Sequence, residues 1–274
     1  MLYNRPKETN TGKYTDTKIA IVTNPNIKKS QEISYRISRH FNSTGYENKI
    51  LDIDNLVAGY DFVFVVGGDG TMLKTARFYS EYATPVMGVN IGRLGFLSLI
   101  SPEETDTLTS ILEGNLFSVQ DRIMLESCGL IALNDIVVKG CLSNRTSKFS
   151  LHINDTHVYD CIADGIVVST PTGSTAYGLS AGGPVLSPEL QCVVIVPICP
   201  HTMTVRPLVI PDTEKITIKS DGLNISADGQ QNILKQKEII IKKSKYSAKL
   251  VFPEDKFYKV LKNKLYWGAT AVSE

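Results

Sequence analysis

The chain places a strand, a glycine-rich turn and a helix in direct succession at Asp61-Phe62-Val63-Phe64-Val65-Val66-Gly67-Gly68-Asp69-Gly70-Thr71. The apolar residues that follow fall on one helical face: Met72, Leu73, Ala76 and Tyr79. At such a corner, backbone N–H groups and the helix dipole together form an anion site. Asp69 is out of place in an anion site unless it takes part in chemistry. Next to a bound phosphate, its carboxylate can accept a proton from an attacking hydroxyl.

A β-hairpin is the alternative interpretation of this turn, because Asp-Gly between apolar runs is a strong hairpin signal. A hairpin needs period-two alternation after the turn, whereas residues 71–77 have helical spacing, which favours the phosphate-binding corner. Lys74 lies in the first turn of this helix, where a cation opposes the helix dipole unless a bound phosphate reverses the sign. A solvated surface lysine is the alternative.

Size and composition bound the class of protein. The 274 residues suffice for one large domain or two ordinary ones, and 42% hydrophobic with 21% charged residues is typical of a soluble globular protein. A net charge of +1 gives neither a basic stripe for nucleic acid nor a polybasic membrane anchor. Residues 1–17 are polar, with no apolar signal segment, and predict a flexible leader. No apolar run approaches the ~20 residues that cross a bilayer.

The cysteines and histidines give no sign of a metal cluster. The five cysteines form no CxxC pair, and several lie inside apolar runs, as Cys192 does. Buried free thiols in a reducing cytoplasm are the simplest account, so we expect a cytoplasmic protein. The four histidines form no HExxH pattern, and the cysteine spacings disfavour a zinc cluster.

Strands and helices alternate in the first part of the chain. Apolar runs predict strands at 18–24, 48–53, 61–66 and 85–90, and helical spacing predicts helices at 27–43 and 71–81. Ser101 and Pro102 are a capping residue and a first-turn residue that open another helix. This alternation predicts an α/β domain with a parallel sheet.

Short β-rich runs separated by turn residues follow after about residue 117, and they predict an all-β C-terminal domain. The runs are 127–132, 135–138, 149–153, 157–162, 165–169, 192–196, 215–219, 223–227, 238–242 and 248–252. A helical pattern at 257–267 predicts a C-terminal helix that returns to the first domain. We therefore expect a nucleotide-binding α/β domain of residues 18–120 plus 255–274, and a β-rich domain of residues 121–254.

Two further glycine-rich blocks follow predicted strands. Residues 90–97, Asn-Ile-Gly-Arg-Leu-Gly-Phe-Leu, come at the carboxyl end of a strand, where open α/β sheets bind ligands, although a tight turn with packing glycines explains them equally well. Residues 163–184 form a loop rich in hydroxyls and glycines, with Tyr177 as a flat face that can stack on a base. That mixture suits an adenosine or nicotinamide moiety, and ordinary turn chemistry is the alternative.

A competing motif, GxSxG, occurs at residues 178–182 and matches the nucleophile elbow of serine hydrolases. The elbow requires a strand directly before its serine, whereas a Thr/Gly loop precedes Ser180. Glu189 is the lone acid between Ser180 and the only later histidine, His201, which leaves no room for a triad. The hydrolase interpretation is therefore disfavoured.

Taken together, these blocks resemble the NAD kinase family. The resemblance covers about 18–267 and is carried by motifs in the family's order: 67–71 (GGDGT), 90–97, 133–135 (LND), 164–177, 200–202, 206–208 and 228–230. The GGDG turn alone is unspecific, because diacylglycerol kinases and phosphofructokinases have similar turns. The long hydroxyl-rich block is far more specific.

The resemblance implies a kinase that transfers the γ-phosphoryl group of ATP to the 2′-hydroxyl of the adenosine ribose of NAD and so produces NADP. Asp69 would be the proton acceptor, which agrees with the chemistry of the turn. Phosphoryl transfer depends mostly on positioning and charge stabilisation. A divalent cation, Mg²⁺, is implied as part of the ATP substrate, with no protein ligands assigned.

The same resemblance implies a set of binding residues. Asn134 and Asp135 would hold the adenosine part of NAD, although an ordinary Asn-Asp β-turn is the alternative. Asp164 would accept from the nicotinamide carboxamide, and Gln230 would add a polar contact. The residues implied for the nucleotide and dinucleotide sites are Gly67, Gly68, Gly70, Thr71, Lys74, Arg145, Thr172, Thr175, Ala176, Tyr177, Gly178, Leu179 and Ser180.

One position departs from the family pattern: Ile162 stands where many members place an arginine, which puts a cation contact there in doubt. The resemblance also implies a homo-oligomer, a dimer or tetramer, with sites completed by a neighbouring subunit. Two alternatives remain. A lipid kinase sharing GGDGT would need an apolar or basic membrane-facing surface. A non-catalytic NADP(H)-binding sensor would gain nothing from Asp69.

Overall fold

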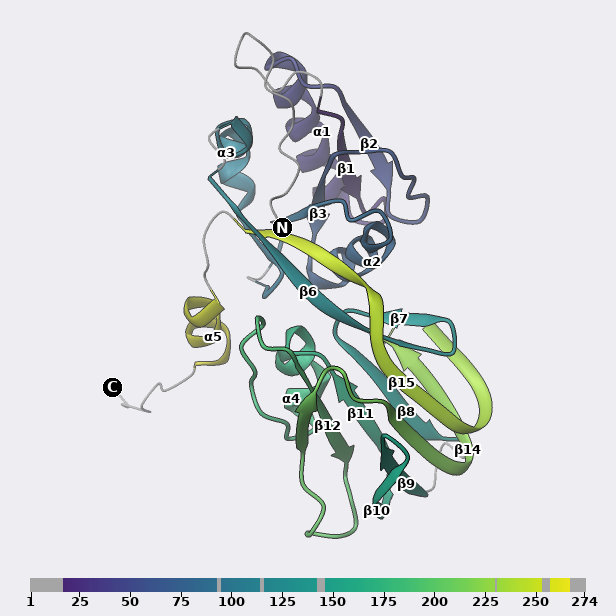
Figure 1. Ribbon diagram of the computed structural model, residues 1–274. Coiled ribbons are helices and arrows are strands. Elements are labelled where there is room, and N and C mark those ends of the chain that lie inside the picture. Colours follow the sequence, from purple (N-terminus) through teal and green to yellow (C-terminus); the bar gives the residue numbers. More distant parts are fainter. Residues whose placement is uncertain are drawn as a thin grey trace, which may run out of the picture. The chain divides into compact units, whose positions relative to one another are not determined.

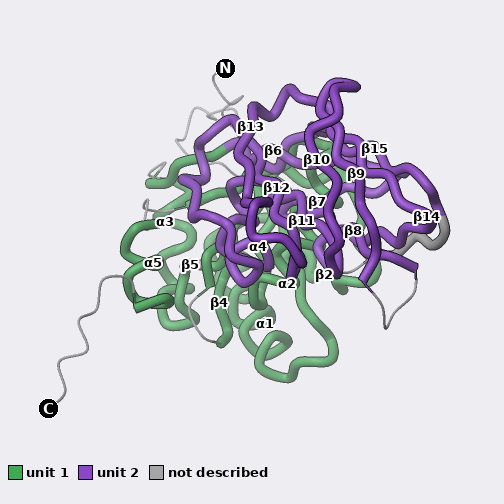
Figure 2. The backbone as a smooth tube through the Cα atoms, turned by 90° about the horizontal axis from the view of Figure 1, so that it is seen from below, with its two compact units in different colours: residues 1–120, 249–274 green, residues 121–248 purple. Residues whose placement is uncertain are grey.

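The computed structural model describes residues 17–92, 95–113, 116–141, 146–229, 231–252 and 257–266, with the backbone alone at 99 and 231–235. The predicted leader lies outside these residues except for Thr17. The chain forms two compact units, residues 1–120 with 249–274 and residues 121–248, which Figure 2 distinguishes by colour.

The first unit is an α/β structure built on parallel strands. Its helices and strands are β1 (Ile19–Thr23), α1 (Lys28–Ser43), β2 (Asn48–Asp52), β3 (Phe62–Gly67), α2 (Asp69–Ser80), β4 (Val86–Asn90), β5 (Ser98–Ile100), the 3-10 helix η1 (Pro102–Thr107), α3 (Leu108–Glu113) and α5 (Phe257–Leu265). Strands β2, β1, β3 and β4 are neighbours in that order and all are parallel; Figure 1 labels the first three. The prediction of an α/β N-terminal domain followed by a C-terminal helix is confirmed.

The burial of β1 and β3 in the core of the first unit explains why both are continuous apolar runs in the sequence. Every residue of both strands is buried, as parallel strands covered on both faces require. Helix α1 packs Ile37 and Phe41 against this sheet, and the Phe41 and Phe64 rings lie 5.2 Å apart. The helix predicted to open at Ser101 begins as η1 and continues as α3, with the Glu104 carboxylate accepting the Ser101 N–H at 2.8 Å.

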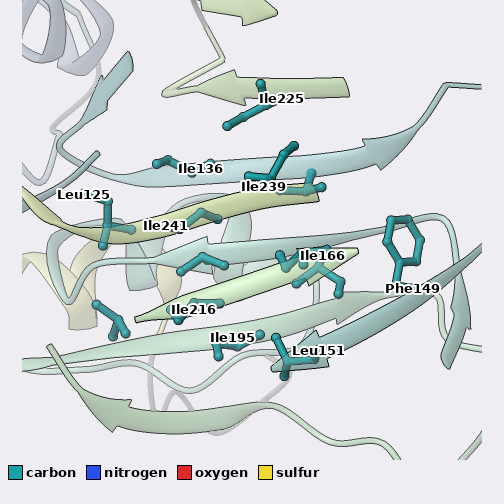
Figure 3. Packing of buried hydrophobic residues seen from close by; sticks show 14 of the residues in the cluster. Leu125, Ile136, Phe149, Leu151, Ile166, Ile195, Ile216, Ile225, Ile239 and Ile241 are labelled. Carbon is teal, nitrogen blue, oxygen red and sulfur yellow. The ribbon is translucent and has the colours of Figure 1, made fainter. Parts of the chain in front are cut away.

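The second unit is built of antiparallel strands. Its elements are β6 (Ser118–Ser127), β7 (Leu130–Ala132), β8 (Asp135–Gly140), β9 (Ser147–Ile153), β10 (Thr156–Ala163), β11 (Gly165–Ser169), the 3-10 helix η2 (Thr172–Thr175), α4 (Tyr177–Ser180), β12 (Cys192–Ile198), β13 (Leu208–Pro211), β14 (Ile216–Ala227) and β15 (Gln231–Phe252). Strands β13, β12, β11, β8, β14 and β15 are neighbours in that order. Figure 3 shows part of the isoleucine-rich core, including Ile136, Ile166 and Ile225.

Several predicted strand boundaries in this unit were wrong. The run predicted at 127–132 is a hairpin: β6 ends at Ser127, β7 begins at Leu130, and the two residues between them have positive φ. The runs predicted at 215–219 and 223–227 are one strand, β14, with a register shift between Lys219 and Leu223. The runs at 238–242 and 248–252 likewise belong to the single strand β15, and the short strands β5 and β13 were not predicted.

The cysteines differ in part from the expectation of buried thiols. All five are free, but only Cys161 is buried, while Cys128 and Cys199 are exposed. Cys128 lies in the turn between β6 and β7, with φ of 51°, which accounts for its exposure.

Candidate active site

Asp69 begins a helix at the carboxyl end of a buried parallel strand. Strand β3 ends at Gly67, Gly68 is the N-cap residue, and α2 starts at Asp69, two residues earlier than the sequence predicted. Gly68 brings no side chain to cap the first turn. The corner is therefore the strand–turn–helix arrangement expected of an anion site, with a carboxylate at its first helical position.

The second glycine-rich block supplies the partners of that carboxylate. The backbone N–H groups of Phe96 and Leu97 donate to Asp69 Oδ2 at 3.1 Å and Oδ1 at 3.2 Å. Gly95 permits this approach, because a Cβ atom there would lie 2.0 Å from Asp69 Oδ1. The sequence had left this block open between a ligand site and a packing turn; in the structure it orients Asp69. Its residues 93 and 94 lie outside the described part of the chain.

A cation from the far end of the sequence also reaches Asp69. Lys264, near the end of α5, places its Nζ 3.4 Å from Asp69 Oδ2. The two side chains are 38% and 31% exposed, so the carboxylate remains accessible to a substrate. Lys264 was not among the predicted site residues. No local sequence signal links it to Asp69, because 195 residues separate the two.

The other predicted residues of this corner have structural contacts. Lys74 forms an ion pair with Asp54 in which both side chains are well exposed. Thr71 packs back on Gly67, where an added Cβ would lie 2.6 Å from its hydroxyl oxygen. Gly70 has open space where a side chain would stand. The corner thus keeps room beside the first turn of α2.

The second unit contains a pocket of about 700 Å³. It brings together four of the predicted binding residues, Asn134, Asp135, Ala176 and Tyr177. The other residues that line the pocket were not predicted to bind a ligand; they are Val137, Lys139, Gly140, Asn224, Ile225, Ser226, Asp228 and Gly229. Lys139 Nζ lies 6.0 Å from the centre of the Tyr177 ring, so a cation and an aromatic face share this pocket.

Asp228 lines the pocket and accepts hydrogen bonds from three consecutive backbone N–H groups. Its carboxylate accepts the N–H groups of Leu133 at 3.0 Å, Asn134 at 2.7 Å and Asp135 at 3.2 Å. Asp228 and Gly229 form the turn between β14 and β15 with φ of 49° and 64°. An Asp-Gly hairpin signal was present in the sequence and could have identified this turn.

Asp135 is a buried carboxyl group in the same pocket. It is 5% exposed, and burial, together with the nearby Asp228 carboxylate, raises its pKa to about 7. Both influences act in the same direction, because each disfavours the charged form. Near neutral pH this carboxyl group can both donate and accept hydrogen bonds.

Most hydroxyl groups of the loop at 169–175 form hydrogen bonds within the protein. Thr170 Oγ1 donates to Leu133 O at 2.6 Å, and an added Cβ at Gly173 would lie 2.1 Å from Asn134 O, so the loop packs tightly on the Asn-Asp segment. Thr172 is buried, and its hydroxyl accepts from Arg122 Nη1 at 3.3 Å. The Thr170 hydroxyl, which was not among the predicted binding residues, therefore holds the loop against the Asn-Asp segment.

The remaining predicted residues lie near this loop or outside the described chain. Gly178 is buried in α4, and Ser180 and Asp164 are exposed; the structure does not place Asp164, Thr172, Thr175, Gly178, Leu179 or Ser180 on the pocket lining. Arg145 and Gln230 lie outside the described residues. Ile162 is exposed. The helix at 177–180 follows a 3-10 helix and not a strand, so the hydrolase elbow is excluded.

No group of three or more His, Cys, Asp or Glu side chains among the described residues could hold a metal ion. No helix among these residues combines the length and apolar character needed to span a bilayer.

The sequence matches two family models. Residues 46–116 match "ATP-NAD kinase N-terminal domain", and residues 133–252 match "ATP-NAD kinase C-terminal domain". Among curated proteins, the NAD kinase of Magnetococcus marinus is 40% identical over 240 residues, covering 81% of this chain and 78% of the relative. The NAD kinase of Clostridium botulinum (strain Kyoto) is 41% identical over 236 residues, covering 80% and 83%.

Solved structures have the same fold. An NAD kinase from Archaeoglobus fulgidus in complex with ATP superposes with a TM-score of 0.76 at 29% identity, covering 91% of this chain and 98% of that one. Yeast NADH kinase complexed with NADH gives a TM-score of 0.80 at 22% identity, covering 94% and 90%, a likeness that concerns the fold alone.

Proposed function

This chain belongs to the ATP-NAD kinase family, and we propose that it phosphorylates NAD with Asp69 as the proton acceptor and with the pocket of the second unit as the dinucleotide site. The overall reaction is the ATP-dependent phosphorylation of NAD to NADP. The role of Asp69 as proton acceptor rests on one observation. Its carboxylate accepts hydrogen bonds from the Phe96 and Leu97 N–H groups at the strand–turn–helix corner.

In the proposed step, Asp69 takes the proton of the hydroxyl that attacks ATP. The adenosine 2′-hydroxyl oxygen forms a bond to the γ-phosphorus of ATP, and its proton passes to the Asp69 carboxylate. The bond from the γ-phosphorus to the β–γ bridging oxygen breaks, and its electron pair leaves with ADP. A base that takes this proton needs a lone pair within about 2.6–3.2 Å of the hydroxyl. The partly exposed carboxylate of Asp69 can meet that requirement.

The phosphates of ATP are proposed to lie at the first turn of α2. Gly68 and Gly70 leave space beside the backbone there, and the helix N-terminus favours negative charge. Mg²⁺ is proposed to arrive with ATP as part of the substrate, because Mg²⁺ keeps several waters and needs few protein ligands.

The adenosine of NAD is proposed to occupy the pocket lined by Asn134, Asp135 and Tyr177. The Tyr177 ring offers a stacking face for adenine, and an amide side chain such as that of Asn134 matches the donor and acceptor on adenine's edge. Asp135 is the candidate partner for ribose hydroxyls. Lys139 lies over Tyr177, where its positive charge suits the dinucleotide's pyrophosphate.

We further propose that the protein is cytoplasmic and forms a homo-oligomer, a dimer or tetramer. The cytoplasmic proposal rests on five free cysteines, and the oligomer rests on membership of the family. Size-exclusion chromatography with light scattering would measure the subunit number, and a monomeric mass would refute the oligomer.

The test of function is incubation of the purified chain with ATP, Mg²⁺ and NAD, with NADP read through an NADP-dependent dehydrogenase. We expect NADP to form, and to form far more slowly with Asp69→Asn. Tight binding of NADP without turnover would instead identify a sensor. Phosphorylation of diacylglycerol in place of NAD would identify a lipid kinase.

A further inference from the structure

The C-terminal helix brings a lysine to the catalytic carboxylate. Lys264 Nζ lies 3.4 Å from Asp69 Oδ2 and 4.9 Å from the centre of the Phe96 ring. Phe96 is also the residue whose N–H group donates to the same oxygen at 3.1 Å. One ammonium group is therefore held by both the carboxylate and the aromatic ring beside it.

Helix α5 has its own packing that fixes this lysine in place. Val260 and Leu261 are buried, and the Phe257 ring lies 6.2 Å from that of Phe96. Lys264 is in the last turn of the helix, where a cation interacts favourably with the helix dipole. The helix lies outside both family-model matches, which cover 46–116 and 133–252.

The donors around Asp69 are distributed unevenly over its two oxygens. Oδ2 receives the Phe96 N–H and the Lys264 ammonium, whereas Oδ1 receives the Leu97 N–H at 3.2 Å. A carboxylate has about four acceptor positions, two on each oxygen. Among the donors that the described part of the chain supplies, Oδ1 keeps one acceptor position.

We propose that Lys264 is a positioning residue for phosphoryl transfer: it saturates Asp69 Oδ2 and presents Oδ1 to the 2′-hydroxyl of the acceptor. This inference rests on the proposed role of Asp69 as proton acceptor. In the transfer step the hydroxyl proton passes to Oδ1, the new oxygen–phosphorus bond forms, and the bond to ADP breaks with its electron pair. Lys264 stays protonated throughout and exchanges neither proton nor electrons.

The first experiment compares three variants of the full chain by steady-state kinetics. Lys264→Met keeps the length of the side chain and removes its charge, and we expect kcat to fall about 10- to 100-fold with an unchanged KM for NAD, because misorientation of a reacting group costs rate. Lys264→Arg should retain most of kcat, since a guanidinium pairs with carboxylates and stacks on aromatic rings. The control is Lys262→Met, because Lys262 is also exposed on α5 but lies about 200° around the helix from Lys264.

Parental kcat in Lys264→Met, with Asp69→Asn inactive, would overturn the inference and leave the proposed function standing. Equal losses in Lys264→Met and Lys262→Met would also overturn it, because the effect would then belong to helix charge in general. Parental turnover in Asp69→Asn would refute the proposed function itself. Thermal unfolding of each variant shows whether a loss of kcat reflects a loss of folded protein.

A double-mutant cycle tests whether Lys264 acts through Asp69. If it does, adding Lys264→Met to Asp69→Asn should cause no further fall in kcat, because the group that it orients is already gone. A further 10- to 100-fold fall in the double variant would mean that Lys264 acts on the phosphoryl group directly, and the positioning role would be wrong.

Discussion

Asp69 in the first unit and Asp135 in the second are both aspartates beside a strand end, in opposite surroundings. Asp69 is partly exposed and receives two backbone N–H groups and an ammonium. Asp135 is buried, lies near a second carboxylate, and its pKa is raised to about 7. The contrast separates two tasks. Exposure with fixed donors suits a group that meets a reacting hydroxyl, whereas burial suits a group that recognises a ligand through hydrogen bonds.

The largest effect is expected at Asp69. Asp69→Asn should lower kcat about 100- to 10,000-fold, the usual contribution of a general base. The KM for NAD should stay close to the parental value, because the residues that line the pocket all belong to the second unit. Steady-state kinetics of both substrates measures this, with Asp106→Asn, an exposed aspartate of η1, as the control. A parental kcat in Asp69→Asn would show that Asp69 is not the proton acceptor.

Gly95 should give the next largest effect. In Gly95→Ala the new Cβ would lie 2.0 Å from Asp69 Oδ1, so the carboxylate must move, and a displacement of this size costs about 100-fold in kcat. Gly92→Ala is the matched control, because Gly92 is exposed and has nothing within 4 Å of an added Cβ. Similar kcat values in the two variants would show that the position of the carboxylate does not limit turnover.

Substitutions of Tyr177 test whether the pocket of the second unit binds the base of NAD. Tyr177→Ala should raise the KM for NAD about 5- to 100-fold, because base–aromatic stacking contributes about 1–3 kcal/mol per base. Tyr177→Phe keeps the ring and should keep the parental KM. Titration with NAD followed by calorimetry gives the affinity directly. An unchanged affinity in Tyr177→Ala would locate the base elsewhere.

Asp135 should give the smallest and most pH-dependent effect. Its pKa is about 7 in the folded state against 3.8 for an unperturbed aspartate, so the folded protein binds more protons than the unfolded chain between these values. The free energy of unfolding therefore falls as pH rises through this window, by up to about 4 kcal/mol. Urea unfolding near pH 5 and pH 8 measures the fall.

Asp135→Asn should reduce this fall, because the amide does not titrate. Asp164→Asn is the control, since Asp164 is exposed and should leave the pH dependence unchanged. If the parental protein and Asp135→Asn lost the same free energy between the two pH values, the buried carboxyl group would not be the source of the dependence.

Local pattern was sufficient for much of the first unit. The strand and helix on either side of the Gly67–Thr71 turn follow from an apolar run and helical spacing, both of which are short-range signals. It was insufficient where a strand contains an irregularity. Strand β14 carries a register shift beyond Lys219, and the Asp221-Gly222 pair there looks like a turn in sequence although the strand continues through it.

The two sites divide in the same way. The residue types of both were visible in sequence: Asp69 in its glycine turn, and Asn134, Asp135 and Tyr177 in their motifs. The partners that determine how those residues behave were not visible. Asp228 contacts the N–H of Asn134 across 94 residues, and Lys264 reaches Asp69 across 195.

Motifs and the spacing between near neighbours were enough to establish the family, the catalytic candidate and the order of the strands and helices of the first unit apart from β5. Three features required the three-dimensional arrangement: the 90–97 block holds Asp69, Asp135 is buried near Asp228, and α5 supplies a cation. Burial, desolvation and charge pairing depend on groups that meet in space, and the linear order of the chain does not specify those meetings.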